Sequence, residues 1–284
     1  MAEPGTLYVV ATPIGNLEDI TLRARRVLGE VDLIAAEDTR VTRKLLARYD
    51  LHRPLTSYHA HSGPRKLAAL VARLQAGESI ALVSEAGLPG ISDPGERLIA
   101  ACIAAAVPVT VIPGPSVLVS ALVVSGLPTA SFHYLGFLPR KQGEQRRAFA
   151  AVAELPATLI FFEAPGRLVA TLRSAREALG NRPAAVAREL TKRFEEVVRG
   201  SLEELISHFT EKPPRGEITV VVGGARETRR AEAGLLPLEA LAAVRAKRAA
   251  GLSHRQAVAE VAAELGVSRR DLYRATLDEK REPQ

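Results

Sequence analysis

The chain has 284 residues, of which 47% are hydrophobic and 25% charged, and it carries a net charge of +6 at pH 7. This length suffices for two domains with a small appendage, and the fractions of hydrophobic and charged residues are ordinary for a globular protein. The longest apolar run, residues 117–124, is interrupted by Ser120 and is too short to span a bilayer, so we expect no membrane partner. The excess of Lys and Arg favours a polyanionic partner.

A cytoplasmic location is expected from two further features. Cys102 is the only cysteine and cannot form an internal disulfide, which is typical of proteins in a reducing compartment. Residues 1–5 include Glu3 and lead straight into an apolar run, so the N-terminus has no signal-peptide pattern.

Short runs rich in Val, Ile and Leu alternate with helical patterns in the first part of the chain. Strands are predicted at residues 7–11, 32–36, 79–84 and 108–112. Helices are predicted at residues 22–28, 42–48, 65–75, 96–105 and 116–125. This βαβ alternation predicts a parallel or mixed sheet covered by helices.

Residues 126–143 interrupt the alternation with three Gly and two Pro, and we place a domain boundary there. The prediction is an N-terminal domain at residues 1–126, a linker at 127–143 and a second domain at 144–224. In the second domain we expect strands at residues 157–162, 184–187 and 217–223, an edge strand at 194–199, and helices at 167–179 and 202–209. The predicted fold class is α/β, with two α/β/α domains, mixed sheets and an interdomain cleft.

Residues 225–284 show only helical patterns, with predicted helices at 238–250, 253–265 and 268–277. Gly251 and Gly266 would end helices, and Ser253 and Ser268 would cap them. Residues 257–274 have the pattern of a helix-turn-helix, which favours an RNA-positioning domain. A packing or dimerisation unit is the alternative.

Seven loops carry carboxylates or hydroxyls, in most cases beside Gly, Pro or Ser, and most of these loops follow a predicted strand. They are residues 12–19, 36–40, 84–95, 113–116, 162–167, 187–192 and 215–217. Strand-end loops of an open α/β sheet bind ligands, so these loops predict one site. Carboxylates would repel a phosphate but suit ribose hydroxyls and a cation. This chemistry predicts S-adenosylmethionine as the cofactor and a methyltransferase as the protein.

Several residues in these loops allow two interpretations. Asp93 is expected to cap the helix that follows it, and Ser116 to cap its own helix while facing the cofactor. Glu37 and Asp38 are adjacent, so only one of them is expected to face the cleft. The other candidate bases are His61, Glu163 and Glu189; the candidate cations are Arg40, Arg167, Arg188 and Lys192. Each Glu–Arg neighbour pair could instead be a structural ion pair. No metal-ligand pattern is present, since His59 and His61 have no Cys or third His nearby.

The motifs TPIGNLEDITLRA, AEDTR, ISDPG, PGPS and RELTK followed by FEE occur in this order. In order and spacing they closely resemble the class III, tetrapyrrole-methylase-like, S-adenosylmethionine-dependent methyltransferases. Within that superfamily they resemble the branch that methylates the ribose 2′-hydroxyl of a cytidine in 16S ribosomal RNA. The chain departs from the family pattern at Glu85, where Asp is usual, at Gly166, where His is usual, and at Ser62, where Asn is common.

The resemblance, taken with the loop chemistry, implies a set of site residues. The implied catalytic residues are Glu37, Asp38, Arg40 and Glu163. The implied cofactor-binding residues are Pro13, Ile14, Gly15, Glu85, Gly87, Leu88, Ser92, Ser116, Val117, Phe162, Ala187, Glu217, Ile218 and Thr219. The implied RNA-binding residues are His61, Arg140, Lys141, Arg167, Lys192, Arg269 and Arg270.

The resemblance also implies partners: 16S ribosomal RNA or the small ribosomal subunit, and a second copy of the chain in a homodimer. Two other functions stay open on the sequence. One is a methylase of a small tetrapyrrole; the other is a ligand-sensing regulator that binds nucleic acid through its tail. A nicotinamide dehydrogenase is disfavoured, because residues 7–19 lack a GxGxxG phosphate loop.

Overall fold

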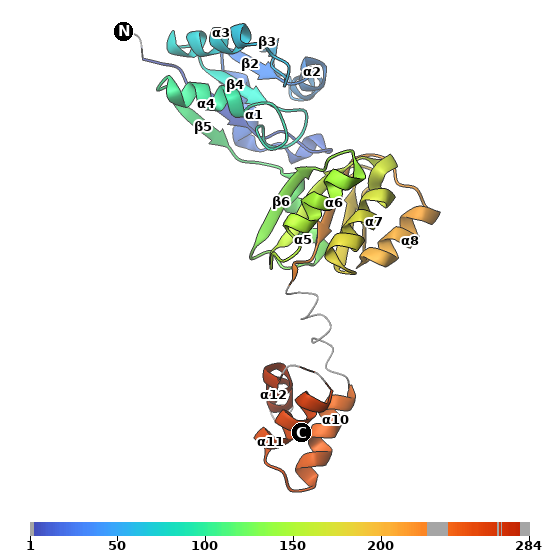
Figure 1. Cartoon of the computed structure of the whole chain (residues 1–284). Helices are drawn as coiled ribbons and strands as arrows, with labels where there is room; N and C mark the ends of the chain where they lie inside the picture. Colours follow the sequence, from blue (N-terminus) through green and yellow to red (C-terminus); the bar gives the residue numbers. More distant parts are fainter. Residues whose placement is uncertain (1–2, 226–237, 266, 268, 279–284) are drawn as a thin grey trace.

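The computed structural model describes residues 3–225, 238–265, 267 and 269–278. It contains two five-stranded sheets, each covered by helices, and a three-helix C-terminal unit (Figure 1). The predicted architecture of two α/β domains and a helical tail is therefore confirmed. Among the described residues, no helix is both long and apolar enough to cross a membrane.

The first sheet is parallel throughout, with strand order β3-β2-β4-β1-β5. Its strands are β1 (Leu7–Val10), β2 (Leu33–Ala36), β3 (Leu55–Ser57), β4 (Ile80–Val83) and β5 (Val109–Ile112). The four predicted strands are confirmed, whereas β3 was not predicted because it has three residues, of which only Leu55 is apolar. The sheet is parallel, one of the two arrangements that the sequence predicts, because a helix lies between every two strands that follow one another in the chain.

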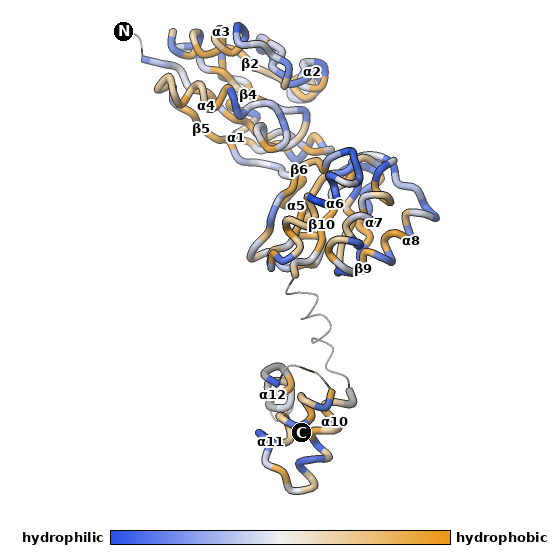
Figure 2. Tube along the Cα trace, in the orientation of Figure 1, coloured by the Kyte–Doolittle hydropathy of each residue, from blue (hydrophilic) through white to orange (hydrophobic). Residues whose placement is uncertain are grey.

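Four helices cover this sheet: α1 (Leu22–Glu30), α2 (Thr39–Arg48), α3 (Pro64–Gln75) and α4 (Glu96–Ala104). Two separate hydrophobic cores result, one on each face of the sheet. The central strands β2 and β4 are buried along their whole length, which explains why their sequences are continuously apolar. Figure 2 shows apolar segments concentrated inside both α/β domains.

The second sheet is mixed, with strand order β6-β7-β10-β8-β9. Its strands are β6 (Phe132–Phe137), β7 (Thr158–Glu163), β8 (Pro183–Arg188), β9 (Glu196–Ser201) and β10 (Ile218–Val222). β6 pairs with β7 in parallel, while β7–β10, β10–β8 and β8–β9 are antiparallel. The helices α6 (Gln142–Ala151), α7 (Leu168–Leu179) and α8 (Leu202–Glu211) also belong to this domain. The predicted edge strand is confirmed as β9.

The predicted domain boundary was placed too late in the chain. Helix α5 (Val117–Ser125) packs on β8, β9 and β10 of the second sheet, and β6 lies inside the segment predicted to be a linker. The Gly residues of that segment have local roles instead. Gly126 ends α5 in the left-handed conformation with φ 77°, and Gly136 has φ 66° at the irregularity in β6. The chain passes from one domain to the other at residues 113–116.

The tail consists of α10 (Leu238–Ala249), α11 (His254–Glu264) and α12 (Arg269–Asp278). Val244, Val258, Val261 and Leu272 form the centre of its own small core. Ser253 caps α11 in a capping box with Gln256, as the sequence predicts, and Gly251 has φ 98° after α10. Ser268 and Gly266, the other predicted cap and stop, lie outside the described residues.

Candidate active site

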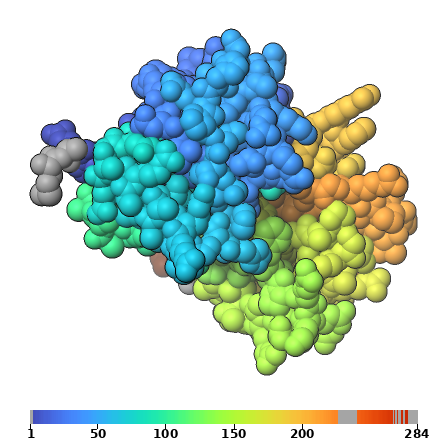
Figure 3. Space-filling view, turned by 90° about the horizontal axis from the view of Figure 1, so that it is seen from above, coloured from blue at the N-terminus to red at the C-terminus, as the bar shows by residue number. Residues whose placement is uncertain are grey.

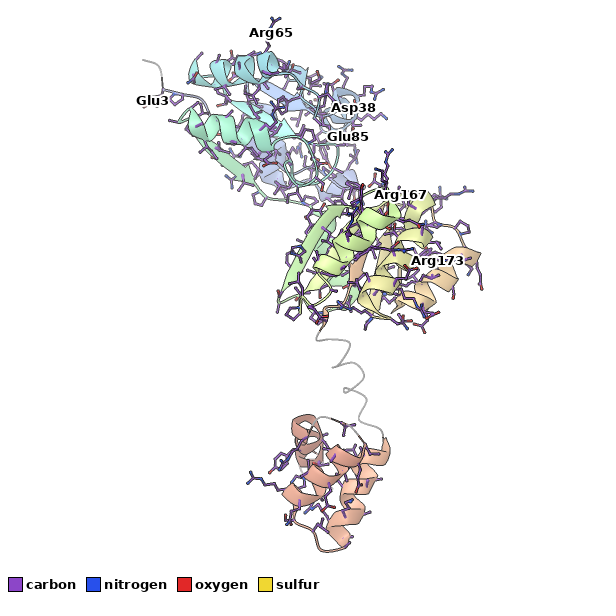
Figure 4. The ribbon with its side chains drawn as sticks, viewed as in Figure 1. Glu3, Asp38, Arg65, Glu85, Arg167 and Arg173 are labelled. Carbon is purple, nitrogen blue, oxygen red and sulfur yellow. The ribbon has the colours of Figure 1, made fainter. Side chains whose placement is uncertain are left out.

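A cavity of about 410 Å³ lies where the two α/β domains meet. Figure 3 shows the first domain, blue to cyan, seated against the second, green to orange. Figure 4 places Asp38 and Glu85 on the side of the first domain that faces the second, and Arg167 on the facing side of the second. The cavity is lined by loops that follow β2, β4 and β7, by the start of α5 and by the start of β10. Strand ends therefore build it, as expected for an open α/β sheet.

The lining carries five carboxylates and no Lys, Arg or His. The acidic residues are Glu37, Glu85, Asp93, Glu163 and Glu217. Apolar side chains, among them Leu88, Val117, Phe137, Phe162 and Ile218, supply much of the remaining wall. Such a cavity has a negative potential beside an apolar surface, which suits a cationic ligand with an aromatic or aliphatic part and disfavours a phosphate.

Three of the carboxylates, Glu37, Glu85 and Asp93, influence one another. The backbone N–H of Glu85 donates to Glu37 Oε2 at 3.4 Å. Burial raises the pKa of Glu37, and the negative charge of Glu85 adds to the rise. Burial also raises the pKa of Asp93, to about 6, with a further contribution from the charges of Glu37 and Glu85. Asp93 thus holds a proton far more readily than a free carboxyl group does.

The expectation that Asp93 caps a helix was wrong. Gly95 occupies the N-cap of α4 and the helix has no side-chain cap, so the Asp93 carboxyl lines the cavity instead. Ser116 does occupy the N-cap of α5, but its hydroxyl makes no capping hydrogen bond. Both side chains are consequently at the cavity without a capping role.

Asp38 and Arg40 do not line the cavity, and they bind each other. Asp38 Oδ1 accepts the backbone N–H of Arg40 at 2.7 Å and so caps α2. Its carboxylate also binds the Arg40 guanidinium through Nε at 3.1 Å and Nη2 at 2.5 Å. These bonds lower the pKa of Asp38 to about 2. Of the two adjacent acids, Glu37 is the one that lines the cavity.

Glu163 lies at the end of β7, with a side chain that is only 1% exposed. Its Oε2 accepts from the Thr171 hydroxyl at 2.6 Å, and Thr171 in turn accepts from Gln145 Nε2 at 2.9 Å. Its Oε1 lies 3.3 Å from Arg167 Nε. Because both oxygens are already engaged, the geometry favours a positioning role for Glu163 over a proton-accepting one.

Ten of the implied cofactor residues line the cavity: Glu85, Gly87, Leu88, Ser92, Ser116, Val117, Phe162, Glu217, Ile218 and Thr219. Pro13, Ile14, Gly15 and Ala187 do not line it. Ile14 and Ala187 are buried in the hydrophobic cluster behind the start of α5. The backbone of Thr12 pairs with Gly87, and Gly15 packs against Lys192 and Thr191. The TPIG loop therefore supports the cavity wall from behind.

None of the implied RNA-binding residues lines the cavity. His61, Arg140, Lys141 and Arg269 are exposed, whereas the side chain of Arg270 lies outside the described residues. Arg167 donates to the carbonyl oxygens of Leu138 and Pro139 and thereby holds the loop that carries Arg140. Lys192 pairs with Glu189 at 3.0 Å and with Glu217 at 3.2 Å.

Seven further residues line the cavity: Ala86, Ile91, Leu118, Phe137, Ala164, Pro165 and Gly216. Five of them lie in the predicted loops 84–95, 162–167 and 215–217, whereas Leu118 and Phe137 lie outside all seven loops. Phe137 was missed because β6 was assigned to a linker; the aromatic alternation of FHYLGF was the signal that could have revealed it. Within the described part of the chain, no group of three metal-ligating side chains is found.

Comparison with known proteins places the chain in a family. Residues 6–206 match the model for the tetrapyrrole (corrin/porphyrin) methylases, so the chain belongs to that methyltransferase family. It is 45% identical over 272 residues, 95% of this chain and 94% of the relative, to the "Ribosomal RNA small subunit methyltransferase I" of Halalkalibacterium halodurans. A relative of the same name from Thermotoga maritima is 46% identical over 78% of this chain and 99% of its own.

Solved structures show the same fold at lower identity. Uroporphyrin-III C-methyl transferase from Thermus thermophilus, complexed with S-adenosylhomocysteine, matches with TM-score 0.55 and 21% identity, over 79% of this chain and 100% of its own. A conserved hypothetical protein from Aeropyrum pernix K1 matches with TM-score 0.61 and 18% identity, over 99% of this chain and 100% of its own.

Proposed function

We propose that this protein transfers a methyl group from S-adenosylmethionine to the ribose 2′-hydroxyl of a cytidine in 16S ribosomal RNA. The observation that carries the proposal is the interdomain cavity with five carboxylates and no cationic side chain in its lining. The relatives named as small-subunit ribosomal RNA methyltransferases, 45–46% identical, support the RNA substrate. The cytoplasm, where small ribosomal subunits are made, is the proposed location.

The lining residues fit this cofactor in charge and in polarity. A sulfonium is a cation that the carboxylates of Glu37, Glu85 and Asp93 would attract, and it brings no phosphate for them to repel. Carboxylate oxygens of Glu85 and Glu217 suit ribose hydroxyls, and Leu88, Val117 and Ile218 offer apolar surface for a purine. When bound, the cofactor supplies an electrophilic methyl group.

A ribose hydroxyl is a weak nucleophile at neutral pH, so the protein must orient it and accept its proton. Glu37 is the proposed base: it lines the cavity, and burial raises its pKa toward the working range of a general base. Asp93 would share the negative field that favours the cation, while Glu163 would position Arg167 and the loop at Leu138 and Pro139.

The proposal is tested by comparing nucleoside digests of 16S ribosomal RNA from cells with and without the gene. The digest from wild-type cells should contain one 2′-O-methylated cytidine that is absent without the gene and restored by complementation. Identical digests from the two strains would exclude this substrate.

We expect the protein to bind S-adenosylmethionine and S-adenosylhomocysteine by calorimetry, and to bind NAD and ATP much more weakly because of the carboxylates. Glu85→Ala should weaken cofactor binding by about 1 kcal/mol, the low end for a lost hydrogen bond, because Glu85 is exposed. Glu30→Ala, which removes an exposed acid paired with Arg26, is the matched control and should change nothing. Equal affinity in all three proteins would assign Glu85 to another task.

The tail is expected to position RNA. Deleting residues 225–284 should leave cofactor affinity intact, because the cavity is built from residues 37–219. RNA affinity should fall, and its dependence on salt should become flatter, because fewer phosphates would be neutralised. Filter binding at several salt concentrations measures both quantities. An unchanged slope would favour the alternative of a packing or dimerisation unit.

A homodimer is also proposed. The edge strand β5 and the helix α5 expose Val111, Val119 and Val123, and β6, the edge strand of the second sheet, exposes Phe132. Exposed apolar side chains on neighbouring elements favour a protein contact.

A further inference from the structure

A second cavity, of about 390 Å³, opens on the second domain directly beside the first. Its walls come from the loop after β8, the last turn of α8 and the segment before β10. Gly216 lines both cavities, so they adjoin at this residue, which we call the partition. A strand that occupies the first cavity and continues past Gly216 would reach the second.

The two cavities differ in charge. Arg188, Lys212 and Arg215 line the second one, together with Glu189 and Glu196. Arg188 is paired with Glu196 at 2.5 Å, and Glu189 with Lys192 at 3.0 Å. Within the part of the chain that the structure describes, Lys212 and Arg215 have no ion-pair partner, and both are exposed. These two cations are therefore available to bind an anion. The lining of the first cavity contains no such cation.

Aromatic and rigid apolar groups stand beside these cations. The Phe194 side chain is 65% exposed at the cavity, although burial of a phenyl ring is strongly favourable. The Arg193 guanidinium lies 5.6 Å from the centre of that ring. His208 and the consecutive residues Pro213 and Pro214 form further wall. Flat apolar surfaces next to cations are the combination that binds single-stranded nucleic acid, through base stacking and phosphate contacts.

Hydrogen bonds and ion pairs connect the loop after β8 to the segment that carries Gly216. The Glu189 carboxylate accepts the backbone N–H of Glu217 at 2.9 Å, and Lys192 bridges Glu189 and Glu217. Glu189 and Thr191 adopt positive φ values of 50° and 65°, which non-glycine residues rarely do. Gly216, with φ 83°, has no room for a side chain, since a Cβ there would lie 2.3 Å from the Glu189 carboxyl carbon. The loop after β8 and the partition are thus locked together.

We propose that the second cavity binds a nucleotide of the RNA strand next to the nucleotide that is methylated. Its base would stack on Phe194, and its phosphate would bind Lys212 and Arg215. This inference rests on the proposed function, because it assigns to the second cavity a nucleotide of the same RNA strand that is methylated in the first. The partition at Gly216 would then separate a ribose in the acidic cavity from a base in the basic one.

The test uses the full-length protein with small ribosomal subunits and protein-free 16S ribosomal RNA from cells that lack the gene. Transfer of radiolabelled methyl from S-adenosylmethionine is measured at several RNA concentrations. Phe194→Leu removes the aromatic face and keeps an apolar side chain, so KM for RNA should rise about tenfold, the lower part of the range for one stacked base. Phe194→Trp keeps stacking and should stay near the wild-type KM.

Lys212→Gln combined with Arg215→Gln should weaken RNA binding and reduce its salt slope by about 1.4, the value for two phosphate contacts on a single strand. Arg65→Gln combined with Arg173→Gln removes two exposed arginines on α3 and α7, away from both cavities, and is the matched control (Figure 4). Cofactor affinity, measured by calorimetry, should be equal in all variants and verifies that they are folded.

The possible outcomes separate the two proposals. Wild-type transfer with a raised KM in Phe194→Leu, rescue in Phe194→Trp and a lower salt slope in the double variant supports the nucleotide site. Wild-type transfer with unchanged KM and slope in these variants overturns the nucleotide site and leaves the proposed function intact. No transfer to either form of RNA by the wild-type protein overturns the proposed function and this inference with it.

Discussion

Replacing Glu37 with Gln is expected to lower the rate of methyl transfer by about 10²–10⁴-fold, the usual cost of losing a general base. The amide keeps the size of the side chain and can still accept the Glu85 N–H, but it cannot take up a proton from the ribose hydroxyl. Cofactor affinity should change much less, as is typical for a group that acts in the transition state. Single-turnover methylation and calorimetry on the same preparation measure the two effects.

Asp38→Asn is the matched control, since Asp38 is the neighbouring acid, does not line the cavity and is bound to Arg40. It should retain most of the transfer rate, with a loss of stability from the weakened cap and ion pair. If Glu37→Gln transferred the methyl group at the normal rate, Glu37 would not be the base. The chemistry would then rest with Asp93 or on alignment of the substrate alone.

Asp93→Asn is expected to stabilise the free protein at pH 7.5 by about 2 kcal/mol. The pKa of Asp93 is about 6 in the folded protein and near 3.8 when the chain is unfolded, so the folded state binds a proton more tightly. Wild-type stability therefore falls as the pH rises from 4 through 6, because folding must then bury a charge, which Glu37 and Glu85 also repel. A full shift of this size corresponds to about 3 kcal/mol, which partial exposure reduces.

The stabilising effect should be nearly absent at pH 4, where the folded wild-type protein already carries the proton. Urea unfolding of both proteins at pH 4, 5, 6 and 7.5 gives the required free energies. Glu96→Gln, an exposed acid three residues further along the chain, serves as the control and should show no such pH dependence. A difference between wild type and Asp93→Asn that did not vary with pH would assign it to packing and not to charge.

The fold could be predicted well where the sequence has a clear pattern of apolar residues. The buried parallel strands β1, β2, β4 and β5 are short continuous apolar runs bounded by helices, and each was placed within two residues. The domain boundary could not be predicted, because Gly126 and Gly136 suggest a linker while they in fact serve a helix end and a strand irregularity. Only the packing of α5 on the second sheet distinguishes these possibilities, and packing between distant segments is not encoded in a local pattern.

The candidate site was predictable in chemistry but less so in detail. Five of the seven predicted loops converge on one cavity, whereas loops 12–19 and 187–192 contribute no lining residue. The sequence could not show whether Asp93 caps a helix or lines the cavity. A residue at the end of a loop and just before a helix can do either. It likewise gave no sign that Pro13 and Gly15 would support the wall from behind, which depends on a contact with Lys192 far along the chain.

Gly216 also bears on how enzymes of this kind can change over evolutionary time. A single position with no tolerance for a side chain belongs to both cavities, and a substitution there would push against Glu189 and disturb the two sites in one step. Substitutions at such a position cannot change one cavity without changing the other. Phe194, Lys212 and Arg215, by contrast, line only the second cavity. Each can be replaced by itself without a change to the carboxylates of the first cavity. New RNA preferences in this lineage are therefore expected to arise at those three positions, while residue 216 remains glycine.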